Sequence, residues 1–263
     1  MSLSTRLALA GATALAISVS ASAGFTTVHA PSAPGEIGHA AILSGVYGGT
    51  FSASGVDFSN GSITATRVHD FNGFSGHSQP LNLLGTNMGT ANDQIWVDGI
   101  AHLQAVARYA GYNQSFGYYQ GSDDPSTGFT SGTLLTLSTN PFLGDGPTAG
   151  PINIQGEWRW GRTGTTTNSS LNTDNADNRD HMVTYRITGS GLASLGYSAD
   201  AVVWMLFWDD QPYDSSDRDF NDLAVEIVAV AMAIPIPAPI ALAGLGLIGV
   251  VVSRRRLAAA VSR

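Results

Sequence analysis

The sequence predicts an all-β fold, a β-sandwich or jelly-roll domain with one helix, lying between a signal peptide and a C-terminal transmembrane helix. Three observations support this class. The 263 residues include 31 glycines, and only 12% are charged, about half the usual share of roughly 25%. Short apolar runs alternate with glycine-containing turns, as they do in antiparallel sheets. The length suits one domain of moderate size with a real core.

The first 23 residues have the order of features found in a secretory signal peptide. Arg6 supplies the positive charge, an apolar, alanine-rich run covers 7–19, and Ala21-Ser22-Ala23 is a small-residue cleavage site. We therefore predict a signal peptide over 1–23, cleavage after Ala23, and an exported domain over 24–233.

Nine strands are expected in the exported domain from apolar runs and alternation. They cover 40–46, 49–58, 62–68, 116–119, 132–138, 152–160, 181–188, 201–208 and 223–230. Asn60-Gly61 predicts a hairpin turn between two of them. The run 201–208 is apolar almost throughout, which is typical of a central strand buried on both faces. In 97–110 the apolar residues fall mostly at helical spacing, so we predict a helix there that ends before Gly111.

The C-terminal segment 234–263 combines a proline motif, a short apolar run and an arginine cluster. Pro237-Ala238-Pro239 precedes thirteen residues without a polar side chain, 240–252, and Arg254, Arg255 and Arg256 follow. A helix of that length spans about 20 Å, so it needs its flanking residues to cross a hydrocarbon core of about 30 Å. The arginines place this end in the cytoplasm and the domain outside.

This arrangement resembles the C-terminal sorting signal of bacterial proteins that an exosortase processes, the PEP-CTERM type. In that family a Pro-Glu-Pro motif precedes the helix, and the signal is cleaved during export. Pro237 and Pro239 match the motif, with Ala238 in the place of glutamate. The resemblance implies an exosortase-like sorting enzyme as partner, transient anchoring in the inner membrane, and a final location at the cell surface or outside the cell. A plain C-terminal membrane anchor is the alternative.

The absence of cysteine and lysine excludes several kinds of chemistry. Without cysteine there are no disulfides, thiolate nucleophiles or cysteine-ligated zinc sites. Without lysine there is no Schiff-base catalysis and no phosphate-loop lysine. All 12 basic residues are arginine, and five of them lie in the end segments, so the domain keeps 7 against all 20 acidic residues, a net charge of −13. This charge argues against nucleic acid as a partner and favours cations.

Six of the 17 aspartates fall between the strands 201–208 and 223–230, where they predict a calcium site. Crowded carboxylates repel one another unless a cation neutralises them, and Ca²⁺ takes six to eight oxygen ligands. An EF-hand is excluded, because Asp222 and Val228 stand where its loop needs glycine and glutamate. A solvated acidic turn is the alternative. The expected ligands are Asp209, Asp210, Asp214, Asp217, Asp219, Asn221 and Asp222, joined by Asp180 if strand 181–188 lies beside 201–208.

Three motifs occur in order along 80–230. They are Asn113 with Phe116, Gly117 and Tyr119; Asp180-His181-Met182-Val183-Thr184; and Ser216-Asp217-Arg218-Asp219-Phe220-Asn221-Asp222-Leu223. Together they resemble a domain of unknown function that is common in exosortase-sorted surface proteins. Asp209-Asp210 stands where that family usually has Glu-Asp. The resemblance implies an extracellular, calcium-binding β-domain without an established activity.

These features predict a calcium-binding protein of the cell surface or extracellular matrix with a structural or adhesive role and no enzymatic activity. One alternative is a carbohydrate-binding module for extracellular polysaccharide, in which sugar rings stack on aromatic side chains. The candidates are Trp96, Trp158, Trp160, Tyr112, Tyr118 and Tyr119. A glycoside hydrolase is a further alternative that requires paired carboxylates, and Glu157 is its candidate acid among only three glutamates.

Overall fold

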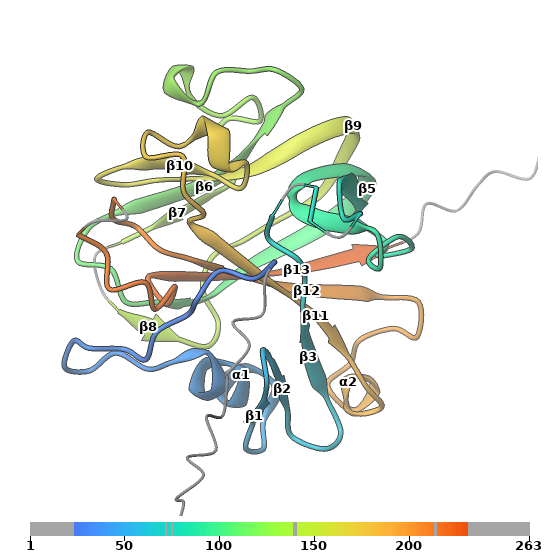
Figure 1. Ribbon diagram of the computed structural model, residues 1–263. Coiled ribbons are helices and arrows are strands. Elements are labelled where there is room, and N and C mark those ends of the chain that lie inside the picture. The colour runs from blue at the N-terminus through green and yellow to red at the C-terminus, as the bar shows by residue number, and fades with distance from the viewer. Residues whose placement is uncertain (1–23, 72, 75, 139–140, 213–214, 231–263) are drawn as a thin grey trace, which may run out of the picture.

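The computed structural model of the protein describes residues 24–71, 73–74, 76–138, 141–212 and 215–230. Within these ranges the strands form one twisted sheet, with β12 and β13 crossing its middle (Figure 1). The neighbours in the sheet are β1-β2-β3-β11-β12-β13-β5-β9-β6-β7, while β4 and β8 also pair with β5, and β10 with β9.

The strands are β1 (Ser52–Ser54), β2 (Asp57–Ser59), β3 (Thr64–Arg67), β4 (Gln79–Asn82), β5 (Ala91–Arg108), β6 (Gln114–Gln120), β7 (Leu135–Leu137), β8 (Phe142–Leu143), β9 (Thr148–Thr163), β10 (Thr167–Ser169), β11 (Met182–Thr188), β12 (Val202–Trp208) and β13 (Leu223–Val230). The helices are α1 (His39–Tyr47), α2 (Gly191–Ser194) and the 3-10 turns η1 (Pro125–Thr127) and η2 (Asn172–Asp174).

The centre of the sheet confirms the prediction for the apolar run 201–208. All seven residues of β12 are buried, and β12 pairs antiparallel with β11 on one side and β13 on the other. Met182 of β11 and Leu223 of β13 both lie opposite Trp208. The acidic segment 209–222 is therefore the connection between two neighbouring central strands. The predicted hairpin at Asn60-Gly61 is confirmed as well, since β2 pairs antiparallel with β3.

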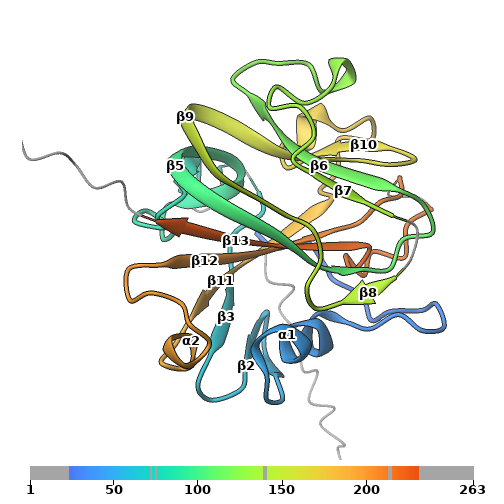
Figure 2. The same cartoon turned by 180° about the vertical axis from the view of Figure 1, so that it is seen from behind.

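Two hydrophobic cores lie on the two faces of β12, because successive side chains of a strand point to opposite sides. Trp204, Leu206 and Trp208 belong to the first core, where they meet tryptophans and a phenylalanine of β5, β6 and β9. Val203, Met205 and Phe207 belong to the second core, which α1 and β11 complete. Seen from behind, α1 lies at one end of the molecule and β6, β9 and β10 at the other (Figure 2). The all-β class is confirmed.

The strand expected at 40–46 is wrong, since these residues form most of helix α1. His39, Leu43 and Tyr47 recur every four residues and are buried together with Ile42, which places them on one face of a helix. Gly48 then ends the helix with a φ of 74°, a value that suits glycine.

The helix predicted at 97–110 is also wrong, because residues 97–108 belong to strand β5, which ends at Arg108. Ala101, Leu103 and Ala105 alternate into the first core, as a strand requires. Ala105 faces Val225 of β13, but Ala107 faces the preceding residue, so Val106 is an extra residue at a bulge. Val106 and Ala107 consequently turn into the second core. The bulge breaks the period of two, and the resulting spacing imitates a helix.

The two predicted targeting segments, 1–23 and 234–263, lie outside the described residues, and so do Ala21, Ala23, Pro237, Pro239 and the arginines Arg254 to Arg256. In the part of the chain that the structure describes, no helix is both long and apolar enough to span a membrane.

Candidate metal centre

The loop between β12 and β13 bends sharply where its acidic residues are densest. Arg218 and Phe220 have φ angles of 58° and 55°, in the left-handed region that few non-glycine residues adopt. Asp217, Asp219 and Asn221 alternate with these two residues. Phe220 is buried in the second core, so the loop is anchored to the sheet at this point rather than standing free in solvent.

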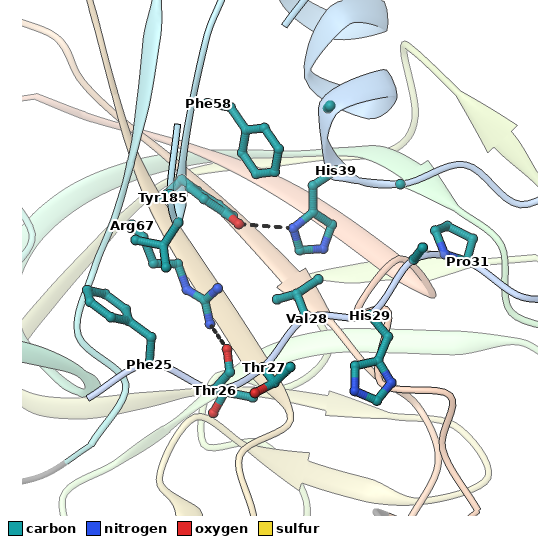
Figure 3. A pocket seen from close by; sticks show the side chains of 15 residues that line it. Phe25, Thr26, Thr27, Val28, His29, Pro31, His39, Phe58, Arg67 and Tyr185 are labelled. Carbon is teal, nitrogen blue, oxygen red and sulfur yellow. Dashed lines mark hydrogen bonds between the residues drawn. The ribbon is translucent and has the colours of Figure 1, made fainter. Parts of the chain in front are cut away.

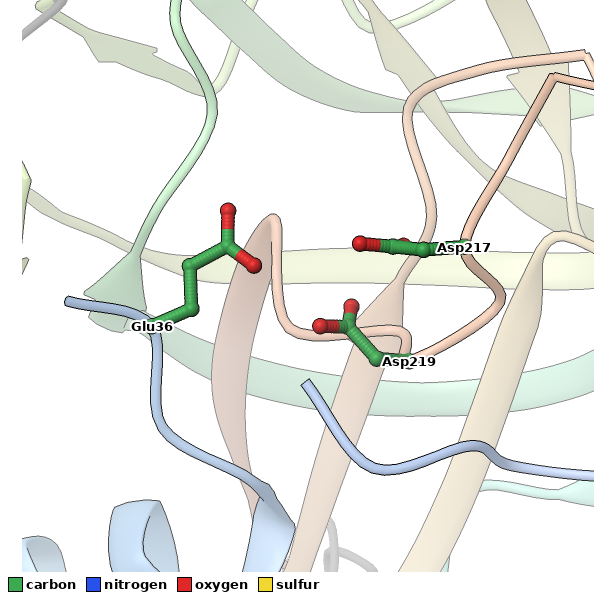
Figure 4. A group of neighbouring side chains, drawn as sticks. All are labelled: Glu36, Asp217 and Asp219. Atoms are coloured by element: carbon green, nitrogen blue, oxygen red, sulfur yellow. The ribbon is translucent and has the colours of Figure 1, made fainter. Parts of the chain in front are cut away.

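Glu36, Asp217 and Asp219 form the first of two acidic groups, here named the outer acidic group (Figure 4). One carboxylate oxygen from each residue lies within 4.8 Å of the other two. Asp219 is 1% exposed. Burial, followed by the negative charges of Asp217, Glu36 and Asp209, raises the pKa of Asp219 to about 7. Burial and the charge of Asp217 also raise the pKa of Glu36.

Two buried acceptor atoms, one beside the outer acidic group and one within it, accept no hydrogen bond. Asn221 is fully buried and donates from Nδ2 to Asp219 Oδ2 over 2.7 Å, yet its Oδ1 has no donor. The same holds for Glu36 Oε2. Buried acceptors in native proteins are nearly always satisfied, and these oxygens together with the adjacent carboxylates could hold a metal ion.

Glu36 reaches the loop because the segment before α1 runs along it. The backbone N–H of His29 donates to Arg218 O over 2.9 Å, and Asn221 Nδ2 lies 3.3 Å from Ile37 O. Ser32 Oγ also donates to Asp217 Oδ2 over 3.4 Å. Sequence reasoning missed Glu36 as a site residue. Its rarity as one of three glutamates was the only signal, and its distance along the chain from the loop hid the contact.

Asp209, Asp210 and Asp222 form the second group, here named the inner acidic group, with carboxylate oxygens again within 4.8 Å of one another. Burial, followed by the charge of Asp210, raises the pKa of Asp222 to about 9. In contrast to the outer acidic group, two arginines face these carboxylates. Burial lowers the pKa of Arg162 and Arg108, and the negative charges of Asp210 and Asp222 act on both arginines in the opposite direction. The inner acidic group thus has cationic partners within the protein.

Asp180 lies in a third polar cluster and not in either acidic group. Strand β11 is the neighbour of β12, as the sequence prediction required, but Thr26 Oγ1 donates to Asp180 Oδ2 over 2.6 Å. Burial, followed by the negative charge of Asp70, raises the pKa of Asp180. Asp70 is buried in an ion pair with Arg67, 2.8 Å long. Of the remaining predicted ligands, Asp214 lies outside the described residues.

The aromatic residues expected to stack on sugars mostly belong to the core. Trp96, Trp158, Trp160 and Tyr119 are completely buried, so these four cannot stack on a bound sugar. Tyr112 and Tyr118 are partly exposed, and Glu157, the candidate acid of a hydrolase, is exposed. A different surface suits a polar ligand better. It is a cavity of about 540 Å³ whose walls include Thr166, Thr167, Asn168, Asp174, Asp177 and His181.

No family model and no curated protein matches this chain. Among solved structures, the C-terminal domain of the BC2L-C lectin from Burkholderia cenocepacia is similar over 52% of this chain and 95% of its own, with 11% identity and a TM-score of 0.31. The Chromobacterium violaceum lectin CV2L, solved in complex with alpha-methyl-fucoside, is similar over 52% of this chain and 96% of its own, with 14% identity and a TM-score of 0.29. Similarities of this size are too low to assign a shared fold or function.

Proposed function

We propose that the chain is an exported calcium-binding β-domain with a structural or adhesive role at the cell surface or in the extracellular matrix. The observation that carries the proposal is the outer acidic group, in which Glu36, Asp217 and Asp219 converge beside a buried amide oxygen without a donor, Asn221 Oδ1. Carboxylate and amide oxygens are the ligands that Ca²⁺ takes in proteins. The ion would neutralise charges that otherwise repel one another.

The burial and charge of the outer acidic group favour a cation site over a solvated turn. Carboxylates in a solvated turn stay in water, whereas Asp219 is buried and the charges that act on it are negative. Calcium–oxygen distances of about 2.3–2.6 Å allow ligands of one ion to lie up to about 5 Å apart, which accommodates the observed 4.8 Å. We assign the ion to this group because the inner acidic group already faces Arg108 and Arg162.

Calcium titration of the purified protein tests the proposal, by calorimetry and by thermal unfolding. Because the ion binds only the folded state, calcium at about 100 times its Kd should add roughly 2.7 kcal/mol to the unfolding free energy. Asp217→Asn should lose most of this gain. Asp200→Asn is the matched control, since it removes the same charge from an exposed aspartate outside both acidic groups. No binding heat in the wild type, or an equal loss in both variants, would refute the site.

Export and sorting belong to the same proposal and rest on the end segments of the sequence. The signal-peptide pattern supports cleavage after Ala23, and the resemblance to exosortase-processed proteins supports removal of the C-terminal sorting signal. Mass spectrometry of the protein recovered from the cell surface of an exosortase-containing bacterium tests both events. A chain that keeps its C-terminal arginines in the membrane fraction would instead support the plain anchor.

Carbohydrate is the second candidate ligand, and the observation that favours it is the cavity of about 540 Å³ whose wall contains several polar side chains. Hydroxyl, amide and carboxylate groups line it, as expected for a site that binds sugar hydroxyls by hydrogen bonds. Glycan-array binding tests this candidate. Ala176→Trp, at the cavity wall, should abolish binding, whereas Ala199→Trp, at an exposed position outside the wall, should not.

A further inference from the structure

A separate cavity of about 750 Å³ lies between the segment before α1 and the strands β2, β3 and β11 (Figure 3). Its walls are largely apolar and aromatic, and they include Phe25, Val28, Val56, Phe58 and Tyr185. The volume is in the range of about 300–1,000 Å³ that small-molecule sites occupy. Neither of the acidic groups lines this cavity.

Three aromatic residues from distant parts of the chain, Phe25, Phe58 and Tyr185, lie in the wall, and Arg67 lies between two of them. Phe58 and Tyr185 lie 5.7 Å apart between ring centroids. The guanidinium carbon of Arg67 lies 5.6 Å from the centre of the Tyr185 ring and 5.8 Å from that of Phe25. Tyr185 is buried and Phe25 stacks on His69 with 4.6 Å between ring centroids, so a ring-containing ligand would contact the exposed parts of Phe25 and Phe58.

The buried polar side chains of the wall, Arg67, His39 and Tyr185, already have partners, so they present little net charge to a ligand. Arg67 is in the ion pair with Asp70. His39 Nε2 lies 3.3 Å from Phe220 O, which can only accept, so its Nδ1 accepts from the Tyr185 hydroxyl at 3.1 Å. A charged ligand would therefore lose its hydration without gaining a partner of opposite charge.

The same segment that walls the cavity carries a ligand of the outer acidic group. His29, Ala30 and Pro31 line the cavity on one side, and Gly38, His39 and Ala40 line it further along the chain. Glu36 lies between these two stretches. An ion held by Glu36, Asp217 and Asp219 would fix the segment against the loop, and with it the position of the wall.

We propose that this cavity binds a small, uncharged, largely apolar molecule that contains a ring, and that calcium at the outer acidic group strengthens the binding by holding the wall in place. The coupling rests on the calcium site proposed above, whereas the cavity itself does not. Coupling of this kind is reciprocal, so the ring-containing ligand should also strengthen calcium binding.

N-phenyl-1-naphthylamine is a suitable probe, because it is uncharged, has aromatic rings and becomes fluorescent in apolar surroundings. Titration into the purified wild-type protein should show one saturable site. Ala40→Trp fills the cavity from α1 and should weaken binding at least about tenfold. Ala41→Trp is the matched control, since this neighbour in the same helix is exposed and does not line the cavity. Ala30→Trp is a second filling variant at an exposed wall position outside the core, and it should weaken binding as well.

Repeating the titration with saturating calcium, with calcium binding measured by calorimetry on the same samples, tests the coupling. We expect an increase in probe affinity of about fivefold or more. Absence of a saturable site, or equal weakening by Ala40→Trp and Ala41→Trp, would overturn the cavity assignment even if calcium binds. Calcium binding without a change in probe affinity would overturn the coupling alone. Failure of calcium to bind would overturn the proposed function together with the coupling, while the tryptophan variants would still decide on the cavity.

Discussion

His39 Nε2 lies 3.3 Å from the backbone carbonyl oxygen of Phe220, so the first residue of α1 is joined to the loop that carries the outer acidic group. The imidazole is buried and stacks on Phe207, with 3.9 Å between ring centroids. Burial lowers the pKa of His39 to about 3, which keeps the ring neutral and leaves one hydrogen to donate to the loop. One side chain thus connects the helix, the central strand β12 and the bend at Phe220.

Replacing this histidine should weaken both the fold and calcium binding. His39→Phe keeps a flat ring against Phe207 but leaves the Phe220 carbonyl without a donor and the Tyr185 hydroxyl without an acceptor. Unsatisfied buried polar groups cost about 1–3 kcal/mol each. Urea unfolding and calcium calorimetry measure the two effects. His102→Phe, at an exposed position in β5, is the control and should stay within about 0.5 kcal/mol of the wild type. An equal effect of both variants would contradict the connecting role of His39.

The buried carboxyl group of Asp93 should make the stability of the protein depend on pH when calcium is removed by a chelator. It is 1% exposed and its Oδ2 accepts no hydrogen bond. Burial, followed by the charges of Asp70 and Asp180, raises its pKa well above 3.8. The folded state therefore keeps a proton that the unfolded chain loses near pH 4. The stabilising contribution is complete below that pH and disappears as the pH rises through the folded-state pKa, with a slope of up to about 1.4 kcal/mol per pH unit.

Asp93→Asn should remove this contribution to the slope, because an amide stays neutral at every pH. Chemical unfolding from pH 4 to pH 9 should then show a flatter curve and a gain in stability at the alkaline end. Asp200→Asn should leave the slope unchanged, since Asp200 is exposed and its pKa is lowered by hydrogen bonds from Ser198 and its own backbone. A curve for Asp93→Asn that is parallel to the wild-type curve would show that Asp93 is ionised in the folded state.

The elements that sequence reasoning predicted well are those in which local pattern and tertiary environment agree. Strand β12 is apolar throughout because both of its faces are buried, and it lies between β11 and β13 in the sheet. Strand β5 was mistaken for a helix because the bulge at Val106 moves its side chains to the other face. Helix α1 was missed because the glycine and alanine around its buried face resemble the composition of the neighbouring strands and turns.

For the candidate site too, the sequence indicated the features that depend on local pattern and missed those that depend on the fold. The density of aspartates located the loop 209–222, and the spacing of Asp217, Asp219 and Asn221 indicated oxygen ligands. Nothing local indicated that the loop divides into two acidic groups, because the division depends on arginines from β5 and β9. Glu36 joins only through the fold, by the hydrogen bonds that hold its segment against the loop.

The hydrogen bonds that Glu226 accepts from two tyrosines should stabilise the folded state. Its carboxylate is 5% exposed, and the hydroxyls of Tyr47 and Tyr197 donate to the same Oε1 over 2.7 and 2.6 Å. Hydrogen bonds to a charged acceptor contribute about 1.5–3 kcal/mol, so Tyr47→Phe and Tyr197→Phe should each cost about that much. A double-mutant cycle by urea unfolding should give a coupling of at least about 0.5 kcal/mol, because the bonds share one atom. Additive costs would show that the two bonds act independently.

Replacing Gly189, directly after β11, should lower the unfolding free energy much more than replacing Gly196. Its φ is 130°, and a Cβ at this position would collide with the Ser62 carbonyl oxygen and lie 2.9 Å from Ile63 Cα. Both are backbone atoms next to β3, which pairs with β11 through Thr188 and Thr64, so neither can move without disturbing the sheet. Gly196 also has a positive φ, 90°, but no atom within 4 Å of its Cβ position.

Gly189→Ala should therefore lower the unfolding free energy by more than about 3 kcal/mol, and Gly196→Ala by about 1 kcal/mol from backbone strain alone. Urea unfolding of the two variants measures the difference, and equal costs would show that the strand end near Ser62 yields to the added methyl group.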